Sequence, residues 1–191
     1  MTGLWPGARR QDWLLASARV LILAAKAILC LIMLGVGIGA IVLLAGQEDI
    51  AAALLAGGTG VALGMANLGI AVFLLGLLVL IAVIFHFVQL LGRIVGTVAA
   101  GDPFIVANAD RLSRMAWLAL AAQLLGFALD LLGAWLGTLF PDGFGGESWH
   151  FSVDRELYLS PEGILLALVL FILARVFRHG TAMRDDLEGT V

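Results

Sequence analysis

Apolar residues fill four long runs of the chain, and polar residues gather between these runs. The runs cover residues 27–45, 68–85, 115–140 and 164–174. The first two contain no charged residue, and the third is interrupted only by Gln123, Asp130 and Thr138. Because a membrane-spanning helix needs roughly 20 apolar residues, the pattern predicts four spans. The fourth run is short and can span only if the Arg175 and Arg178 side chains reach the interface.

The helical segments extend beyond the apolar runs. Residues 11–45, 68–100 and 103–140 each form a stretch without an internal proline. At 1.5 Å per residue, these stretches exceed a hydrocarbon core of about 30 Å. Trp117 and Trp135 lie roughly 27 Å apart along one helix and mark its two interfaces. The sequence therefore predicts helices that continue past the inner face of the membrane.

Composition makes the membrane the expected solvent for this chain. Hydrophobic residues make up 62% of it and charged residues 13%, with a mean hydropathy of +1.06. A soluble domain carries about 25% charged residues. We therefore expect one all-α membrane domain, an integral-membrane four-helix bundle with cytoplasmic helix extensions and short ordered outer loops. The predicted spans are about 23–45, 68–90, 116–138 and 161–179, with a cytoplasmic hairpin at 91–115 and outer loops at 46–67 and 139–160.

The distribution of Lys and Arg predicts the orientation. Ten of the 11 Lys and Arg residues precede or open the first span, lie between spans two and three, or close the fourth. Only Arg155 falls in an outer loop. The positive-inside rule then places both termini and the hairpin in the cytoplasm of a multi-pass cell-membrane protein.

The hairpin contains a helix-stop signal followed by a helix-start signal. Gly101 suits the left-handed position that ends a helix. Asp102 can cap the next helix, and Pro103 suits its first turn. An apolar stripe at helical spacing follows, formed by Phe104, Ile105, Ala109, Leu112 and Ala116. We expect the stripe to pack on the extensions of the first two helices; the alternative is that part of it binds a cytoplasmic partner.

Both outer loops show signs of order. Residues 49–56 predict a short interfacial helix, and the alternation in residues 149–159 predicts short strands. Ser160 and Pro161 form a second cap-and-first-turn signal, with Glu162 near the positive end of the helix dipole.

The sequence offers little evidence of catalysis. No metal-protease, hydrolase, redox or phosphate-loop motif is present, and the single cysteine, Cys30, has no His partner at readable spacing. We expect a protein that is not an enzyme, with no catalytic residue, no cofactor, no metal site and no direct contact with nucleic acid.

Asp130 is the ionisable residue deepest in a predicted span. Such residues are functional candidates by default. The favoured interpretation is that Asp130 faces the bundle interior and pairs with a donor such as Arg155. Proton or ion coupling and a hydrated interface position remain alternatives.

Two stretches carry a family resemblance. The first is GDPFIVANADRL, with a matching pattern at Gly101, Pro103, Phe104, Asn108, Arg111 and Leu112. The second is the tail, with matching positions at Val176, Phe177, Arg178, Gly180, Asp185, Asp186, Leu187, Thr190 and Val191. Together they resemble the bacterial four-span membrane family catalogued as domain of unknown function 2975.

The resemblance implies a fold and a regulatory context. Members of this family are often encoded beside a small helix-turn-helix regulator, which implies a membrane component acting at the cytoplasmic face on such a DNA-binding partner. The alternative function is a small transporter or ion-coupled protein that uses Asp130. For the hairpin, we expect Asn108 and Arg111 to reach one partner together and Asp186 of the tail to pair with Arg111 or Arg114.

Overall fold

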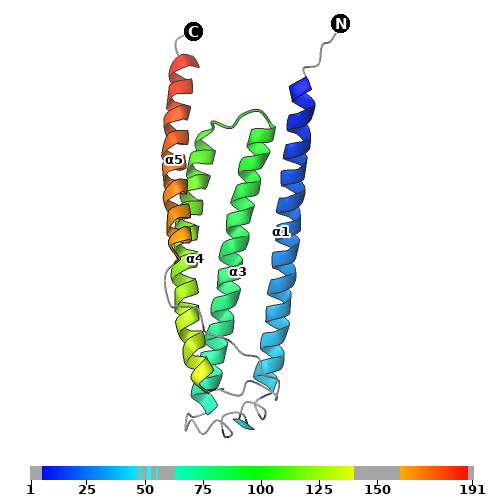
Figure 1. The fold of residues 1–191 in the computed structure, drawn as a ribbon, viewed down its shortest axis with the longest axis vertical. Coiled ribbons are helices and arrows are strands. Elements are labelled where there is room, and N and C mark those ends of the chain that lie inside the picture. The colour runs from blue at the N-terminus through cyan, green and yellow to red at the C-terminus, as the bar shows by residue number, and fades with distance from the viewer. Residues whose placement is uncertain are drawn as a thin grey trace. The chain divides into compact units, whose positions relative to one another are not determined.

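The computed structural model describes residues 6–46, 63–139 and 160–188, together with residues 48, 51, 52 and 55. This part of the chain forms four long helices and no strand (Figure 1). They are α1 (Pro6–Ala45), α3 (Leu63–Ala99), α4 (Val106–Leu139) and α5 (Pro161–Glu188). The all-α prediction is confirmed. The predicted short helix and strands of the outer loops lie wholly or largely outside the described residues.

Each of the four helices contains a segment long and apolar enough to cross a membrane. The segments are Leu15–Leu43, Leu63–Ala99, Val106–Leu139 and Pro161–Met183. The fourth, which looked short from its uncharged run, reaches 23 residues because the helix continues through Arg175 and Arg178. Four such helices support a multi-pass membrane protein.

All four helices are longer than a bilayer core. They contain 40, 37, 34 and 28 residues, which correspond to roughly 42–60 Å at 1.5 Å per residue. α5 starts with Pro161 at its first position and Glu162 in its first turn, as the sequence predicts. Proline is favoured there because the first helical N–H has no partner within the helix.

Contacts divide the chain into two compact units, and each helix except α5 contributes to both. Unit 1 comprises Met1–Cys30, Val83–Ala121 and Pro161–Val191, and unit 2 comprises Leu31–Ala82 and Ala122–Ser160. All Lys and Arg residues within the described ranges belong to unit 1.

Close packing of α3 against α4 characterises unit 2. Ala66, Ile70 and Leu139 form its buried cluster. A Cβ atom placed on Gly76 would lie 2.7 Å from Cδ2 of Leu129, closer than real Cβ contacts allow. Small residues thus let the two helices approach, as in other membrane helix pairs.

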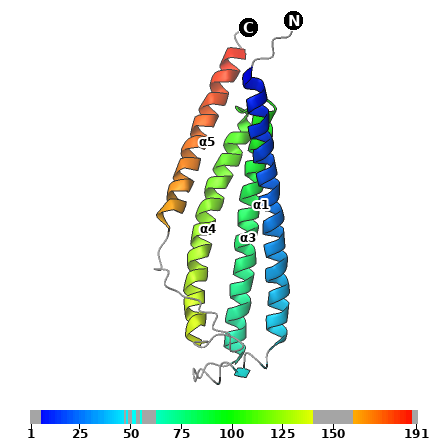
Figure 2. The same cartoon turned by 45° about the vertical axis from the view of Figure 1, so that its right-hand side comes forward.

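The core of unit 1 joins α3, α4 and α5. Its buried residues are Leu90, Leu112, Met115, Ala116, Leu170 and Ala174. Figures 1 and 2 show α5 running beside the first half of α4. The apolar stripe of the hairpin therefore packs on α3, one of the two helices that the sequence predicts, and also on α5, which the sequence did not predict. The stripe bridges helices distant in sequence, so periodicity showed its buried face but not the helix that covers it.

Candidate functional site

The α3–α4 connection begins with a Schellman motif, a helix end closed by a left-handed glycine. Gly101 has φ +84° and is the only described residue at positive φ. Its N–H donates to the Val98 carbonyl at 3.1 Å, and the Asp102 N–H donates to the Thr97 carbonyl at 3.1 Å. These two bonds satisfy carbonyls that the end of a helix leaves unpaired. The predicted role of Gly101 as a helix stop is confirmed.

The next helix starts later than the sequence predicts. α4 begins at Val106, so Asp102 cannot be its cap and Pro103 is not its first residue. The Pro103 carbonyl is instead bound by the Asn108 side chain, whose Nδ2 lies 2.8 Å away. The Asp102 backbone N–H binds the Thr97 carbonyl at the end of α3, and the chain between the two helices is not helical.

Asn108 is the centre of the connection. Its side chain is fully buried, with 0% exposure. Nδ2 donates both to the Pro103 carbonyl and to Oγ1 of Thr97 at 2.7 Å, and Oδ1 accepts from Arg111 at 2.8 Å. One amide therefore ties α4 to the connection and to the last turn of α3. Burial of a polar group is tolerated here because both ends of the amide are paired.

Arg111 lies one turn beyond Asn108 and is directed back toward α3. Besides binding Asn108, its Nη1 approaches the Arg93 carbonyl at 3.5 Å. Asn108 and Arg111 thus bind each other within the hairpin, and their joint contact with one partner stays a prediction. The side chain of Asp186, the predicted partner of Arg111, lies outside the described residues.

An aromatic contact joins the connection to α5. The rings of Phe104 and Phe177 are 5.2 Å apart and tilted by 35°. A Cβ atom placed on Gly180 would lie 3.1 Å from Cδ1 of Phe104, so the absence of a side chain there makes room for the ring. The two stretches that carry the family resemblance therefore meet in space. We call Thr97, Gly101, Pro103, Phe104, Asn108, Arg111, Phe177 and Gly180 the hairpin cluster.

Arg178 forms an ion pair at the edge of this cluster. Its Nη2 lies 3.5 Å from Oδ1 of Asp110, and both side chains are more than half exposed. Exposed pairs contribute little to stability, so this one adds little to folding.

Sequence reasoning missed Thr97 and Asp110. Thr97 binds Asn108 and also donates from Oγ1 to the Ile94 carbonyl at 2.8 Å. The signal in the sequence that could have indicated Thr97 is its hydroxyl, about one turn before Gly101. Asp110 lies within the matching stretch but outside the quoted pattern. Its ion pair with Arg178 depends on how α4 and α5 meet, which the sequence alone does not give.

Asp130 belongs to unit 2 and is not part of the hairpin cluster. Its side chain is exposed, so it does not face the interior of its unit as the favoured interpretation required. Arg155, its predicted partner, lies outside the described residues. A carboxylate exposed at membrane depth is costly, which favours a position near an interface over the centre of the bilayer.

The polar side chains of the hairpin cluster are bonded within the protein. It contains one amide, one hydroxyl and one guanidinium, which pair with each other and with carbonyls. Among the described residues, no group of three or more His, Cys, Asp or Glu side chains is placed to hold a metal ion.

Family comparison matches residues 62–191 to the model described as a protein of unknown function, DUF2975. The chain belongs to the DUF2975 family. The matched region contains α3, α4, α5 and every residue of the hairpin cluster, whereas α1 lies outside it. No curated protein matches this DUF2975 protein, and no solved structure does.

Proposed function

We propose that this DUF2975 protein is a non-enzymatic regulatory or binding component of a membrane, and that it acts through the hairpin and the C-terminal half of α5. Its partner would be a cytoplasmic protein, with a small helix-turn-helix regulator as the candidate. The family resemblance supplies that candidate.

One observation carries the proposal: the two patterned stretches contact each other and build a single structure beside an exposed ion pair. Asn108 binds Thr97 and Pro103, and the Phe104 ring contacts Phe177 and lies next to Gly180. The exposed Asp110–Arg178 pair lies beside it. A local structure that presents exposed charges suits the docking of a protein with complementary charges.

The charge distribution supports a cytoplasmic position for this surface. Every Lys and Arg in the described ranges lies in unit 1, which also contains the hairpin cluster. The positive-inside rule relates such an excess to the cytoplasmic side of a membrane protein.

Charge reversal at the exposed ion pair tests the proposal. Asp110→Arg and Arg178→Asp should each reduce copurification of the regulator from solubilised membranes, and the double exchange should restore part of it. Folding should survive, because an exposed pair is worth only about 0–1 kcal/mol. Arg19→Asp, at an exposed position on α1, is the matched control and should retain the partner. If both single variants bind the regulator normally, the hairpin cluster has only a structural role.

A further inference from the structure

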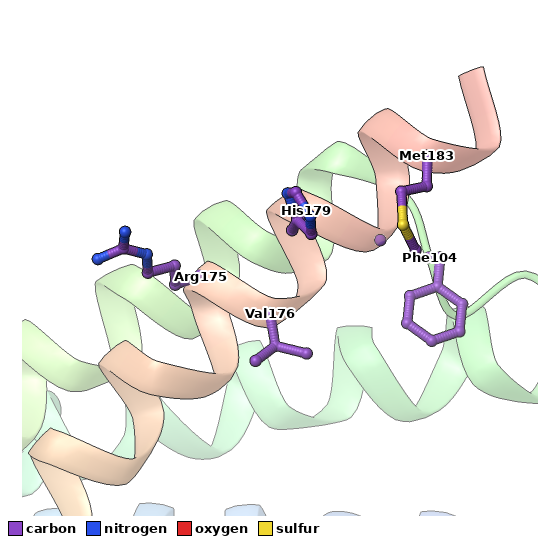
Figure 3. Close-up of a pocket in the computed structure, with 6 residues that line it drawn as sticks. Phe104, Arg175, Val176, His179 and Met183 are labelled. Carbon is purple, nitrogen blue, oxygen red and sulfur yellow. The ribbon is translucent and has the colours of Figure 1, made fainter. Parts of the chain in front are cut away.

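An open groove runs along the C-terminal half of α5. Its volume is about 700 Å³. The lining residues are Phe104, Arg175, Val176, His179, Gly180 and Met183. Figure 3 shows Phe104 coming from the α3–α4 connection and the other labelled side chains from α5. All six belong to unit 1, and we call this feature the α5 groove.

The depth of the groove follows from an aromatic contact. Trp117, which is 65% exposed, meets Phe171 of α5 edge-on at a ring distance of 5.5 Å. Tryptophan favours the membrane interface. Arg175 and His179 lie about one and two turns beyond Phe171, or roughly 6 and 12 Å along the helix. Both basic side chains therefore lie at the level of lipid headgroups.

Among the side chains that the structure describes, the basic residues of the groove have no acidic partner. Arg178 binds Asp110, but neither Arg175 nor His179 makes an ion pair among the side chains that the structure describes. They are four residues apart on one helix, so their side chains lie on the same face of it. An anion placed between them would accept hydrogen bonds from both side chains.

The rest of the groove is apolar and exposed. Phe104 is 45%, Val176 55% and Met183 56% exposed. Exposed apolar surface next to unpaired positive charge matches an amphiphile whose anionic group adjoins hydrocarbon. A free phosphate ion would use only the charges and leave this apolar surface in water.

We propose that the α5 groove binds an anionic phospholipid of the surrounding leaflet. Arg175 and His179 bind its phosphate, while Val176, Met183 and Phe104 contact the glycerol and the first methylenes of its acyl chains. Basic pockets beside membrane helices hold anionic headgroups in this way. The inference is independent of the proposed function, because a lipid can occupy the groove without a cytoplasmic partner.

Native mass spectrometry of the purified full chain tests this proposal. The protein is exchanged into equimolar phosphatidylglycerol and phosphatidylcholine, and the two retained lipids are counted. We expect phosphatidylglycerol to be preferred, and Arg175→Gln to lower the preference about 5-fold. The His179→Gln variant and the double variant should also lower it. Inorganic phosphate should not displace the lipid.

The matched control removes two exposed charges outside the groove. Arg19→Gln combined with Arg114→Gln should keep the preference for phosphatidylglycerol. Melting temperatures in detergent check that each variant folds. If the double variant does not fold, the two single variants still test the lipid preference. Equal retention of both lipids, an equal loss in the control, or displacement by inorganic phosphate would overturn the proposal. Preserved lipid preference together with loss of a copurifying protein in Arg175→Gln would assign the groove to a protein instead.

Discussion

Asn108 is a polar residue that the fold cannot easily replace. Its amide makes three hydrogen bonds while fully buried. Removal of one partner from a buried polar pair leaves the other unsatisfied. Asp is no substitute, because a carboxylate cannot donate to the Pro103 carbonyl.

We therefore expect Asn108→Ala to lower the free energy of unfolding by about 1–3 kcal/mol. Asn108→Asp should also destabilise the protein, despite its gain of charge attraction to Arg111. Thermal unfolding in detergent measures both. Thr138→Ala removes an exposed hydroxyl that donates to the Trp135 carbonyl and serves as the control. Unfolding temperatures equal to that of the control would mean that the Asn108 bonds contribute nothing.

Gly101 shows a conformational requirement at a single residue. At φ +84° an L-residue with a Cβ atom is strained, by roughly 1–2 kcal/mol. Gly101→Ala should destabilise the protein by about that amount. Gly96→Ala, in open helical space one turn earlier, should be neutral or stabilising. Chemical or thermal unfolding of the two variants in the same detergent compares them directly, and an equal response would contradict the prediction.

Asp130 is an exposed residue of unit 2, and its predicted effect on stability is small. Substitution of an exposed side chain usually changes stability by no more than about 0.5 kcal/mol. Asp130→Asn should therefore leave the melting temperature in detergent nearly unchanged. A large loss would indicate a structural pair, and pH-dependent transport by the wild type that is lost in the variant would support ion coupling.

At the scale of helices and turns, the contact between Phe104 and α5 decides how the connection meets the last span. Phe104 lies between the Phe177 ring and the backbone at Gly180. The three residues belong to one interaction, so their effects on stability should not add.

A double-mutant cycle measures this coupling. Gly180→Ala gains helix propensity but forces the Phe104 ring to shift, because the new Cβ would lie 3.1 Å from it. In a Phe104→Ala background the same substitution should be more favourable by about 0.5–1.5 kcal/mol. Additive effects would show that the ring moves away freely.

The sequence predicted these elements better than it predicted their contacts. Gly101 and Pro161 act through local backbone rules, and the structure confirms the positions of both. The burial of Asn108 depends on Thr97, which another helix supplies, and the Phe104–Phe177 contact depends on α5. Hydrophobic periodicity gives the buried face of a helix but not the identity of its neighbour. The local cap rules likewise predict that α4 starts at Pro103, three residues before its actual start at Val106. The sequence does not show that the Asn108 side chain binds the Pro103 carbonyl.

At the scale of the whole molecule, the orientation of the four spans is the property most open to direct test. The positive charges of unit 1 predict that Gly101 and the C-terminus face the cytoplasm. Reporter fusions after Gly101 and Val191 should therefore read as cytoplasmic, and fusions after Gly57 and Gly146 as extracytoplasmic. An extracytoplasmic signal at Val191 would remove the fourth span from the topology, and a cytoplasmic signal at Gly146 would show that α4 does not cross.

The distance along the chain between Phe104 and Phe177 sets an order of events during synthesis. A ribosome that adds about 5–20 residues per second needs several seconds to make the roughly 70 residues between them. The turn at Gly101 joins α3 and α4 by a short connection, so these helices can pair as soon as both have emerged. During those seconds Phe104 has no contact with Phe177, and the nascent hairpin exposes the surface that α5 later covers. A chaperone or insertase that recognises incompletely synthesised chains would bind this exposed surface of the hairpin.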